Sequence, residues 1–293
     1  MKYLKLIRIT NWLKNVFVIF PLVFSLHLFQ INSIKATLLA FLLFSFTGSA
    51  LYILNDILDI DKDRLHPRKK NRPLPSGEIG ISLALIIMTL FAISVGILNF
   101  LLPINFRIAL LFYFMTNLAY NFGLKNVNLI ESITLAVNFV IRVLAGCYAI
   151  AVVPSNWILV ITFFIALFLT LIKRKSELKI LQDNAVQHRK VLKNYTVDML
   201  DKLIYICATI TLTAYMLYTI DAKVTEIFGT DKLVFSTIFV VLGIFRFIQL
   251  SESKQYSDEG DPTTLLLKDA FSQIVFGLWV IYIVVIIYLK PIL

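Results

Sequence analysis

Long apolar stretches alternate with polar segments along the whole chain. Nine stretches are about as long as a helix must be to cross a lipid bilayer. They run over 15–30, 36–54, 82–102, 106–121, 129–152, 156–172, 203–220, 233–250 and 271–289. In lipid a segment must satisfy its own backbone hydrogen bonds, so each stretch is predicted to be a helix. The pattern predicts an all-α, polytopic membrane protein with nine transmembrane helices, folded as a single integral membrane domain over residues 1–293.

The polar segments are concentrated on one side of these predicted helices. The segments 55–81, 121–128, 173–202 and 251–270 fall on the same side as the N-terminus if every stretch spans the membrane. Most of the 28 Lys and Arg residues lie there too, which by the positive-inside rule places the N-terminus in the cytoplasm. We therefore expect a protein of the plasma membrane with its functional groups at the cytoplasmic face, around a central cavity that opens to the cytoplasm.

The composition agrees with a membrane protein. Hydrophobic residues make up 59% of the 293 residues, and the mean hydropathy is +0.83, which excludes a soluble domain. The net charge of +10 follows from topology and from predicted phosphate ligands, so it gives no support for nucleic-acid binding. No A-x-A site follows the first apolar stretch, so no signal-peptide cleavage is expected. Cys147 and Cys207 lack metal-binding spacing and are interpreted as small apolar fillers.

Four aspartates lie where the second apolar stretch ends. Asp56, Asp59 and Asp63 are spaced i, i+3 and i+7, so on a continuing helix they share one face, whereas Asp61 is interpreted as solvated. Three like charges on one stripe repel one another unless a cation lies between them. Mg²⁺ prefers such hard oxygen ligands and completes its shell with water and substrate phosphates. The spacing therefore predicts a Mg²⁺ site, with a solvated helix end as the alternative.

Basic residues follow the aspartates at once. They are Lys62, Arg64, Arg68, Lys69, Lys70 and Arg72. A metal-binding face beside a cationic loop suits a diphosphate substrate. Attraction of the loop to anionic lipid is the alternative explanation, above all for Arg68.

The aspartate motif resembles one from a known superfamily of membrane enzymes. Asn55-Asp56-x-x-Asp59-x-x-x-Asp63 is similar to the first aspartate-rich motif of the UbiA-type membrane prenyltransferases. The longer string, through Arg64-x-His66-Pro67-x-Lys69 to Arg72-Pro73, resembles the decaprenyl-phosphate phosphoribosyltransferase branch. This resemblance implies a UbiA-like fold and a Mg²⁺ cofactor. The implied substrates are phosphoribosyl diphosphate and a polyprenyl phosphate.

Shorter stretches along nearly the whole chain resemble the same branch. The opening Arg8-x-x-Asn11-Trp12-x-Lys14-Asn15, followed by Pro21, is similar to R-P-x-Q-W-x-K-N, although Ile9 replaces the proline and Asn11 the glutamine. The others are Leu124-Lys125, Phe139-Val140-Ile141-Arg142-Val143-x-Ala145-Gly146, Lys173-Arg174-x-x-Glu177-Leu178, Arg189-x-Val191-Leu192-x-x-Tyr195, and Gly260-x-Pro262 with Asp269.

One departure from the superfamily favours phosphoribosyl transfer. Prenyltransferases of this kind carry a second aspartate-rich motif at the end of the sixth helix, but here that position is Lys173-Arg174-Lys175-Ser176-Glu177. One carboxylate among three cations is a poor metal site and a good anion site. A phosphoribosyl donor and a lipid phosphate together bring three anionic groups. The alternative is that these cations only anchor the helix by the positive-inside rule.

The resemblance also implies a role for each candidate residue. Asp56, Asp59 and Asp63 would be the catalytic residues, holding Mg²⁺ against the donor diphosphate. The lipid phosphate, whose second pKa is about 6, would attack the ribose without an obligatory base. His66 is the one candidate for such a base. The predicted substrate-binding residues are Lys14, Asn55, Arg64, Lys70, Arg72, Tyr120, Lys125, Arg142, Lys173, Arg174 and Glu177.

Two residues of the resembling stretches, Arg142 and Trp12, are expected within or beside the membrane. Arg142 is predicted deep in an apolar stretch, where a cation is costly unless it is paired. It is interpreted either as a cavity-lining ligand or as a structural pair with Glu131 or Asn138 of its own helix. Trp12 suits an interfacial anchor as well as a substrate contact.

Three other functions agree less well with the sequence. A prenyltransferase acting on an aromatic or other small acceptor would need carboxylates in place of Lys173 to Lys175. A CDP-alcohol phosphotransferase expects D-x-x-D-G-x-x-A-R, but no glycine follows Asp59. A transporter would distribute polar groups through the midplane rather than along one face. The expected partners are the two substrates and the lipid bilayer, with a homo-oligomer left open and no nucleic acid.

Overall fold

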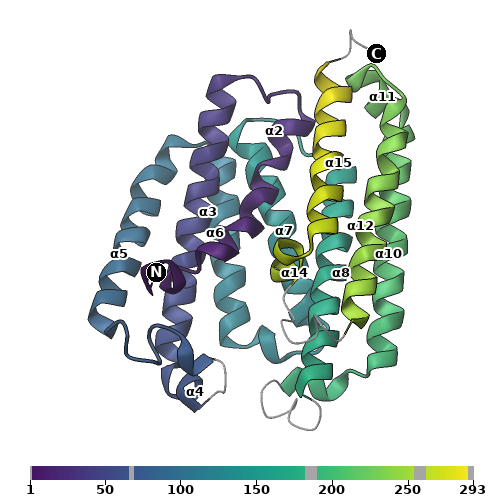
Figure 1. The fold of residues 1–293 in the computed structure, drawn as a ribbon. Helices are drawn as coiled ribbons and strands as arrows, with labels where there is room; N and C mark the ends of the chain where they lie inside the picture. Colours follow the sequence, from purple (N-terminus) through teal and green to yellow (C-terminus); the bar gives the residue numbers. More distant parts are fainter. Residues whose placement is uncertain (1, 66–68, 182–189, 254–261, 290–293) are drawn as a thin grey trace. The chain divides into compact units, whose positions relative to one another are not determined.

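Helices are the only regular secondary structure that the computed structural model describes (Figure 1). The described residues are 2–65, 69–181, 190–253 and 262–289. Contacts divide the chain into two compact units, Met1–Phe122 with Ile141–Pro154, and Gly123–Val140 with Ser155–Leu293. The helix α7 (Ile130–Ala149) begins in the second unit and ends in the first. The single transferase domain over residues 1–293 stays a prediction.

The remaining helices belong to one unit each. In the first unit they are α1 (Lys2–Leu6), η1 (Ile9–Val18), α2 (Phe20–Phe24), α3 (Ile31–Leu58), α4 (Ile60–Leu65), η2 (Lys69–Asn71), α5 (Ile81–Leu98), η3 (Asn99–Leu101) and α6 (Ile104–Phe122). In the second they are η4 (Leu124–Asn126), α8 (Asn156–Leu181), η6 (Lys190–Asn194), α10 (Val197–Ile220), α11 (Ala222–Phe228), η7 (Lys232–Ser236), α12 (Thr237–Glu252), α14 (Pro262–Lys268) and α15 (Ala270–Tyr288).

Seven helices within the described residues are long and apolar enough to cross a membrane, not nine. The prediction fails for the fourth and first stretches. Polar residues such as Arg107 and Asn117 lower the mean hydropathy of α6, which corresponds to the fourth stretch. The first stretch folds as the short helices η1 and α2, with Pro21 in the first turn of α2. The all-α, polytopic membrane class is confirmed.

The short helix η1 packs directly on the backbone of α7. A Cβ atom at Gly146 would lie only 2.2 Å from the carbonyl oxygen of Val18 and 3.0 Å from the Pro21 ring. Only a glycine permits that approach. The contact fixes the end of η1 against the half of α7 that belongs to the first unit.

Two apolar clusters lie close in sequence to the candidate residues, one in each unit. In the first unit Leu74 and Ile79, from the loop after η2, pack with Ile53 of α3 and with Leu6. In the second unit a larger core joins α8, η6, α10 and α12. Its buried members include Phe168, Ile172, Leu192, Ile204 and Ile244. Burial of each such side chain contributes roughly 1.5–3 kcal/mol.

A buried lysine connects three helices of the second unit. Lys175 of α8 is 1% exposed, and its ammonium group donates to Asp201 of α10 and to Glu252 of α12. Lys179, one turn further along α8, contacts the second oxygen of Glu252 at 2.8 Å. The sequence predicts that Lys175 belongs to an anion site, but in the structure its ammonium group connects α8 to α10 and α12.

Replacing Lys175 with methionine is expected to lower the stability of the protein. The substitution keeps the apolar stem but removes hydrogen bonds to two carboxylates, so the free energy of unfolding should fall by about 2 kcal/mol. Thermal unfolding in detergent measures the change. The control is Lys179→Met, since that side chain is 30% exposed and its partner keeps Lys175. Equal melting temperatures for both variants would contradict the structural role.

Candidate functional site

The helix that carries the aspartates is interrupted within the motif. The α3 helix ends at Leu58, and Asp59 has φ −102° and ψ 11° before α4 begins at Ile60. The prediction that the three aspartates share one continuing helix face is therefore wrong at Asp59. Hydrogen bonds still cross the break, from the Asp59 amide to Asn55 (3.0 Å) and from the Asp63 amide to Asp59 (2.8 Å). Hydrogen-bonded turns therefore continue on both sides of Asp59.

Asp56 and Asp63 are brought together around a single guanidinium group. Their residues are only 2% and 3% exposed. The NH1 nitrogen of Arg72 donates to Asp56 Oδ1 at 3.0 Å and to Asp63 Oδ2 at 2.7 Å. Lys69 approaches the other oxygen of Asp63 at 3.4 Å. Two buried carboxylates thus share one cation, which relieves the repulsion that their proximity creates.

Arg8 also reaches this cluster, although the sequence analysis assigned it no role. Its NH2 nitrogen donates to Asp56 Oδ1, and its guanidinium lies 4.6 Å from the centroid of the Tyr52 ring. Burial lowers the pKa of Arg8 from its usual value, and the negative charge of Asp56 opposes that effect. Arg8 and Asp56 are 48 residues apart in the sequence, so spacing could not reveal the pair. The only signal was the place of Arg8 in the opening motif.

The other two aspartates of the motif are less buried. The side chain of Asp59 is 24% exposed and lies 3.8 Å from the Lys62 ammonium group. Asp61 is 87% exposed and pairs with Arg64 at 3.2 Å. This arrangement agrees with the interpretation of Asp61 as a solvated residue, and it uses Arg64 in a surface pair.

The acidic residues fit Mg²⁺ by donor type and in part by arrangement. Carboxylate oxygens are the ligands that this ion prefers. Asp56 and Asp63 already hold one cation between them, because the same Arg72 nitrogen contacts both. In the ranges that the structure describes, no three His, Cys, Asp or Glu side chains are gathered around one point. Asp59 as the third ligand therefore stays a prediction.

Arg142 is held by a polar network within the first unit. It is 6% exposed, and it donates to Asn15 Oδ1 at 2.8 Å and to the Tyr113 hydroxyl at 2.9 Å. Asn15 in turn donates to Ser45 at 2.9 Å. Each of these hydrogen bonds stabilises the fold more because Arg142 is buried, since an unpaired cation among apolar helices costs free energy. Asn15, from the opening motif, is thus a positioning partner that the sequence analysis left without a role.

A second shared guanidinium lies in the other unit. Arg174 is 1% exposed, and its Nε donates to Glu131 Oε1 at 2.8 Å while its NH1 donates to Glu177. Glu131 is fully buried and also accepts from Ser132 at 2.6 Å. The predicted anion site is therefore partly neutralised, because Arg174 already pairs with two carboxylates. The sequence alone suggests Glu131 only as a partner of Arg142.

The remaining predicted ligands are less deeply placed. Asn55, Lys14 and Tyr120 are half-buried in the first unit, Lys125 and Lys173 are half-buried in the second, and Arg64 and Lys70 are exposed. The predicted central cavity stays a prediction. His66, Pro67, Arg68, Arg189 and Gly260 lie outside the described residues.

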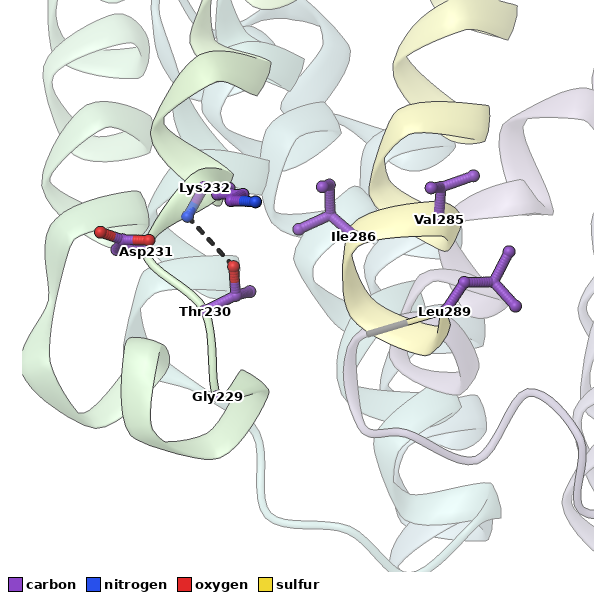
Figure 2. Close-up of a pocket in the computed structure, with 7 residues that line it drawn as sticks. All are labelled: Gly229, Thr230, Asp231, Lys232, Val285, Ile286 and Leu289. Atoms are coloured by element: carbon purple, nitrogen blue, oxygen red, sulfur yellow. Dashed lines mark hydrogen bonds between the residues drawn. The ribbon is translucent and has the colours of Figure 1, made fainter. Parts of the chain in front are cut away.

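The second unit also contains a cavity at the C-terminal end of α15. It has a volume of about 230 Å³ and is lined by Gly229, Thr230, Asp231, Lys232, Val285, Ile286 and Leu289 (Figure 2). It lies where η7 begins and α15 ends, whereas Glu252 and Asp269 are at the other ends of α12 and α15. None of the predicted site residues lines it.

Comparison with known proteins agrees with the motif analysis. Residues 16–266 match the family model described as the UbiA prenyltransferase family. The chain is 29% identical over 293 residues to a decaprenyl-phosphate phosphoribosyltransferase of Corynebacterium glutamicum, covering 98% of this chain and 87% of that protein. It is 30% identical over 158 residues to a digeranylgeranylglyceryl phosphate synthase of Sulfurisphaera tokodaii, covering 54% of this chain and 55% of that one.

A solved structure shares the fold. A UbiA homolog from Archaeoglobus fulgidus bound to GPP and Mg²⁺ aligns with a TM-score of 0.72 at 21% identity, over 98% of this chain and 99% of that one. At this identity the likeness concerns the fold alone. Together with the family match, it leads to one conclusion: this chain is a multi-pass integral membrane transferase that belongs to the UbiA prenyltransferase family.

Proposed function

We propose that this protein transfers a 5-phosphoribosyl group from phosphoribosyl diphosphate to a polyprenyl phosphate and releases diphosphate. The observation that carries the proposal is the likeness to a decaprenyl-phosphate phosphoribosyltransferase over 98% of the chain. The cationic run Lys173-Arg174-Lys175 supports it, since a prenyl diphosphate user needs acidic metal ligands there.

In the proposed reaction the bond between ribose C1 and the diphosphate oxygen breaks, and a bond from C1 to an oxygen of the lipid phosphate forms. Asp56, Asp59 and Asp63 would hold Mg²⁺, which when bound neutralises charge on the departing diphosphate. The acceptor phosphate is largely ionised near neutral pH because its second pKa is about 6, so it needs no proton removed. Positioning and electrostatics therefore supply most of the rate.

The basic residues have the task of placing the two anionic substrates. Arg72 is 29% exposed and lies beside the aspartates, so its guanidinium is within reach of a diphosphate bound there. Arg174 is 1% exposed and must exchange a carboxylate for any phosphate it binds. Lys173, next to it on α8, is more exposed than Arg174. We therefore propose Lys173 as the donor-binding cation at the end of α8. The cation distribution supports a cytoplasmic site and N-terminus in the plasma membrane.

A prenyltransferase is the second candidate, favoured by the partial likeness to a digeranylgeranylglyceryl phosphate synthase. The deciding experiment uses purified protein in detergent with Mg²⁺ and polyprenyl phosphate. Labelled phosphoribosyl diphosphate and a labelled prenyl diphosphate, the latter with small acceptors, are tested in parallel. We expect label in the lipid from the phosphoribosyl donor. Transfer from the prenyl donor alone would overturn the proposal, and binding without turnover of either would favour a transporter.

Asp59→Asn is expected to lower the turnover number at least about 100-fold, as the loss of a group that stabilises transition-state charge does. Asp56→Asn should do the same. The matched control is Asp61→Asn, two residues away, whose side chain is 87% exposed. Steady-state rates with labelled donor measure the effect, after the melting temperature has shown that each variant is folded. A wild-type rate in Asp59→Asn would remove it from the metal site.

Lys173→Ala is expected to raise the KM for the donor about tenfold, since a hydrogen bond to a charged group contributes roughly 1.5–3 kcal/mol. Arg174→Ala is a poorer test because it leaves buried Glu131 without its guanidinium. The control on the same helix is Lys179→Ala, because the Lys179 side chain pairs with Glu252. An unchanged KM in Lys173→Ala would exclude this lysine from donor binding.

A further inference from the structure

The loop that carries Arg72 is held firmly against α3. The Arg72 amide donates to the Lys69 carbonyl at 2.9 Å, and the Arg72 carbonyl accepts from the Ser76 amide at 3.0 Å. Leu74, two residues later, is 2% exposed and packs with Ile53, one turn before Asp56. The backbone of Arg72 is therefore fixed, and its side chain alone decides whether the guanidinium stays on the carboxylates.

Arg72 occupies the oxygens that a divalent ion would need. One nitrogen lies 3.0 Å from Asp56 Oδ1 and 2.7 Å from Asp63 Oδ2, so a metal between the two carboxylates must displace it. The displaced guanidinium would lose its two charge-assisted hydrogen bonds to buried carboxylates and would need other acceptors. The side chain is 29% exposed, so it is free to turn outward if an anion is present. A diphosphate offers the paired oxygens that an arginine binds best.

We propose that Arg72 couples the binding of the metal to the binding of the diphosphate donor. Without a diphosphate, Arg72 competes with the ion for Asp56 and Asp63 and keeps metal affinity low. With a diphosphate, Arg72 moves its hydrogen bonds to the phosphate oxygens and frees the carboxylates for the ion. The coupling is reciprocal, so the metal strengthens diphosphate binding by the same factor. This inference rests on the proposed function only in assuming a metal-bound diphosphate donor.

The coupling distinguishes Arg72 from an ordinary phosphate ligand. An arginine that only bound the diphosphate would not affect binding of the metal alone. An arginine that only stabilised the fold would weaken both events when removed. A coupling residue has opposite effects: its removal tightens binding of the metal alone and weakens binding of the metal with diphosphate.

The test uses Mn²⁺ as the probe ion. Free Mn²⁺ is measured by electron paramagnetic resonance in titrations of wild type and Arg72→Gln, and a preformed Mn²⁺–methylenediphosphonate complex is titrated by calorimetry. We expect Arg72→Gln to bind Mn²⁺ alone about five- to 150-fold more tightly than wild type, the usual range of allosteric coupling. The same variant should bind the complex more weakly than wild type.

Two further variants control for charge and folding. Lys5→Gln removes one exposed positive charge from the same unit and should leave both affinities close to wild type. Arg72→Lys keeps the positive charge but lacks the forked guanidinium, so it should lose most of the coupling. This variant keeps the test valid if Arg72→Gln folds poorly. Equal Mn²⁺ affinity in wild type and both Arg72 variants would overturn the inference and leave metal-dependent transfer standing. If wild type bound neither Mn²⁺ nor the complex, the proposed function itself would fail.

Discussion

The structure depends on the pairing of buried carboxylates with guanidinium groups at the ends of apolar helices. Asp56 and Asp63 lie 2% and 3% exposed in a chain whose interior is otherwise largely apolar, and each would be destabilising alone. Arg72 makes their proximity tolerable, and Arg8 adds a second cation on Asp56. The two carboxylates are thereby assembled around shared cations before any substrate arrives.

The same solution recurs in the second unit with different residues. Arg174 joins Glu131 and Glu177, just as Arg72 joins Asp56 and Asp63. In both cases one arginine is shared by two carboxylates, at least one of them from another segment of the chain. The two clusters differ in exposure, because Arg174 is 1% exposed and Arg72 is 29% exposed. Arg174 is consequently fixed in the interior, whereas Arg72 keeps access to solvent and to an incoming anion.

The apolar runs predicted the helices well because length and hydropathy are local properties of the sequence. The acidic motif was also visible from spacing, whereas Mg²⁺ as the ion that it binds stays a prediction. What spacing could not show is the break at Asp59, which depends on how α4 and its loop pack on α3. Partners far apart in the sequence were missed for the same reason. Arg8 with Asp56, Arg174 with Glu131 and Lys175 with Glu252 become neighbours only through tertiary packing.

The contact between Gly146 and Val18 has a consequence for charge in the membrane. Gly146 lies one turn after Arg142 on α7, and Val18 lies one turn after Asn15 on η1. The close approach of the two backbones is therefore what brings the Asn15 amide within 2.8 Å of the guanidinium. A methyl group at position 146 would push η1 outward and take the Asn15 hydrogen bond from the buried Arg142, although it touches neither residue. The residue without a side chain at position 146 thus governs a hydrogen bond of a buried cation.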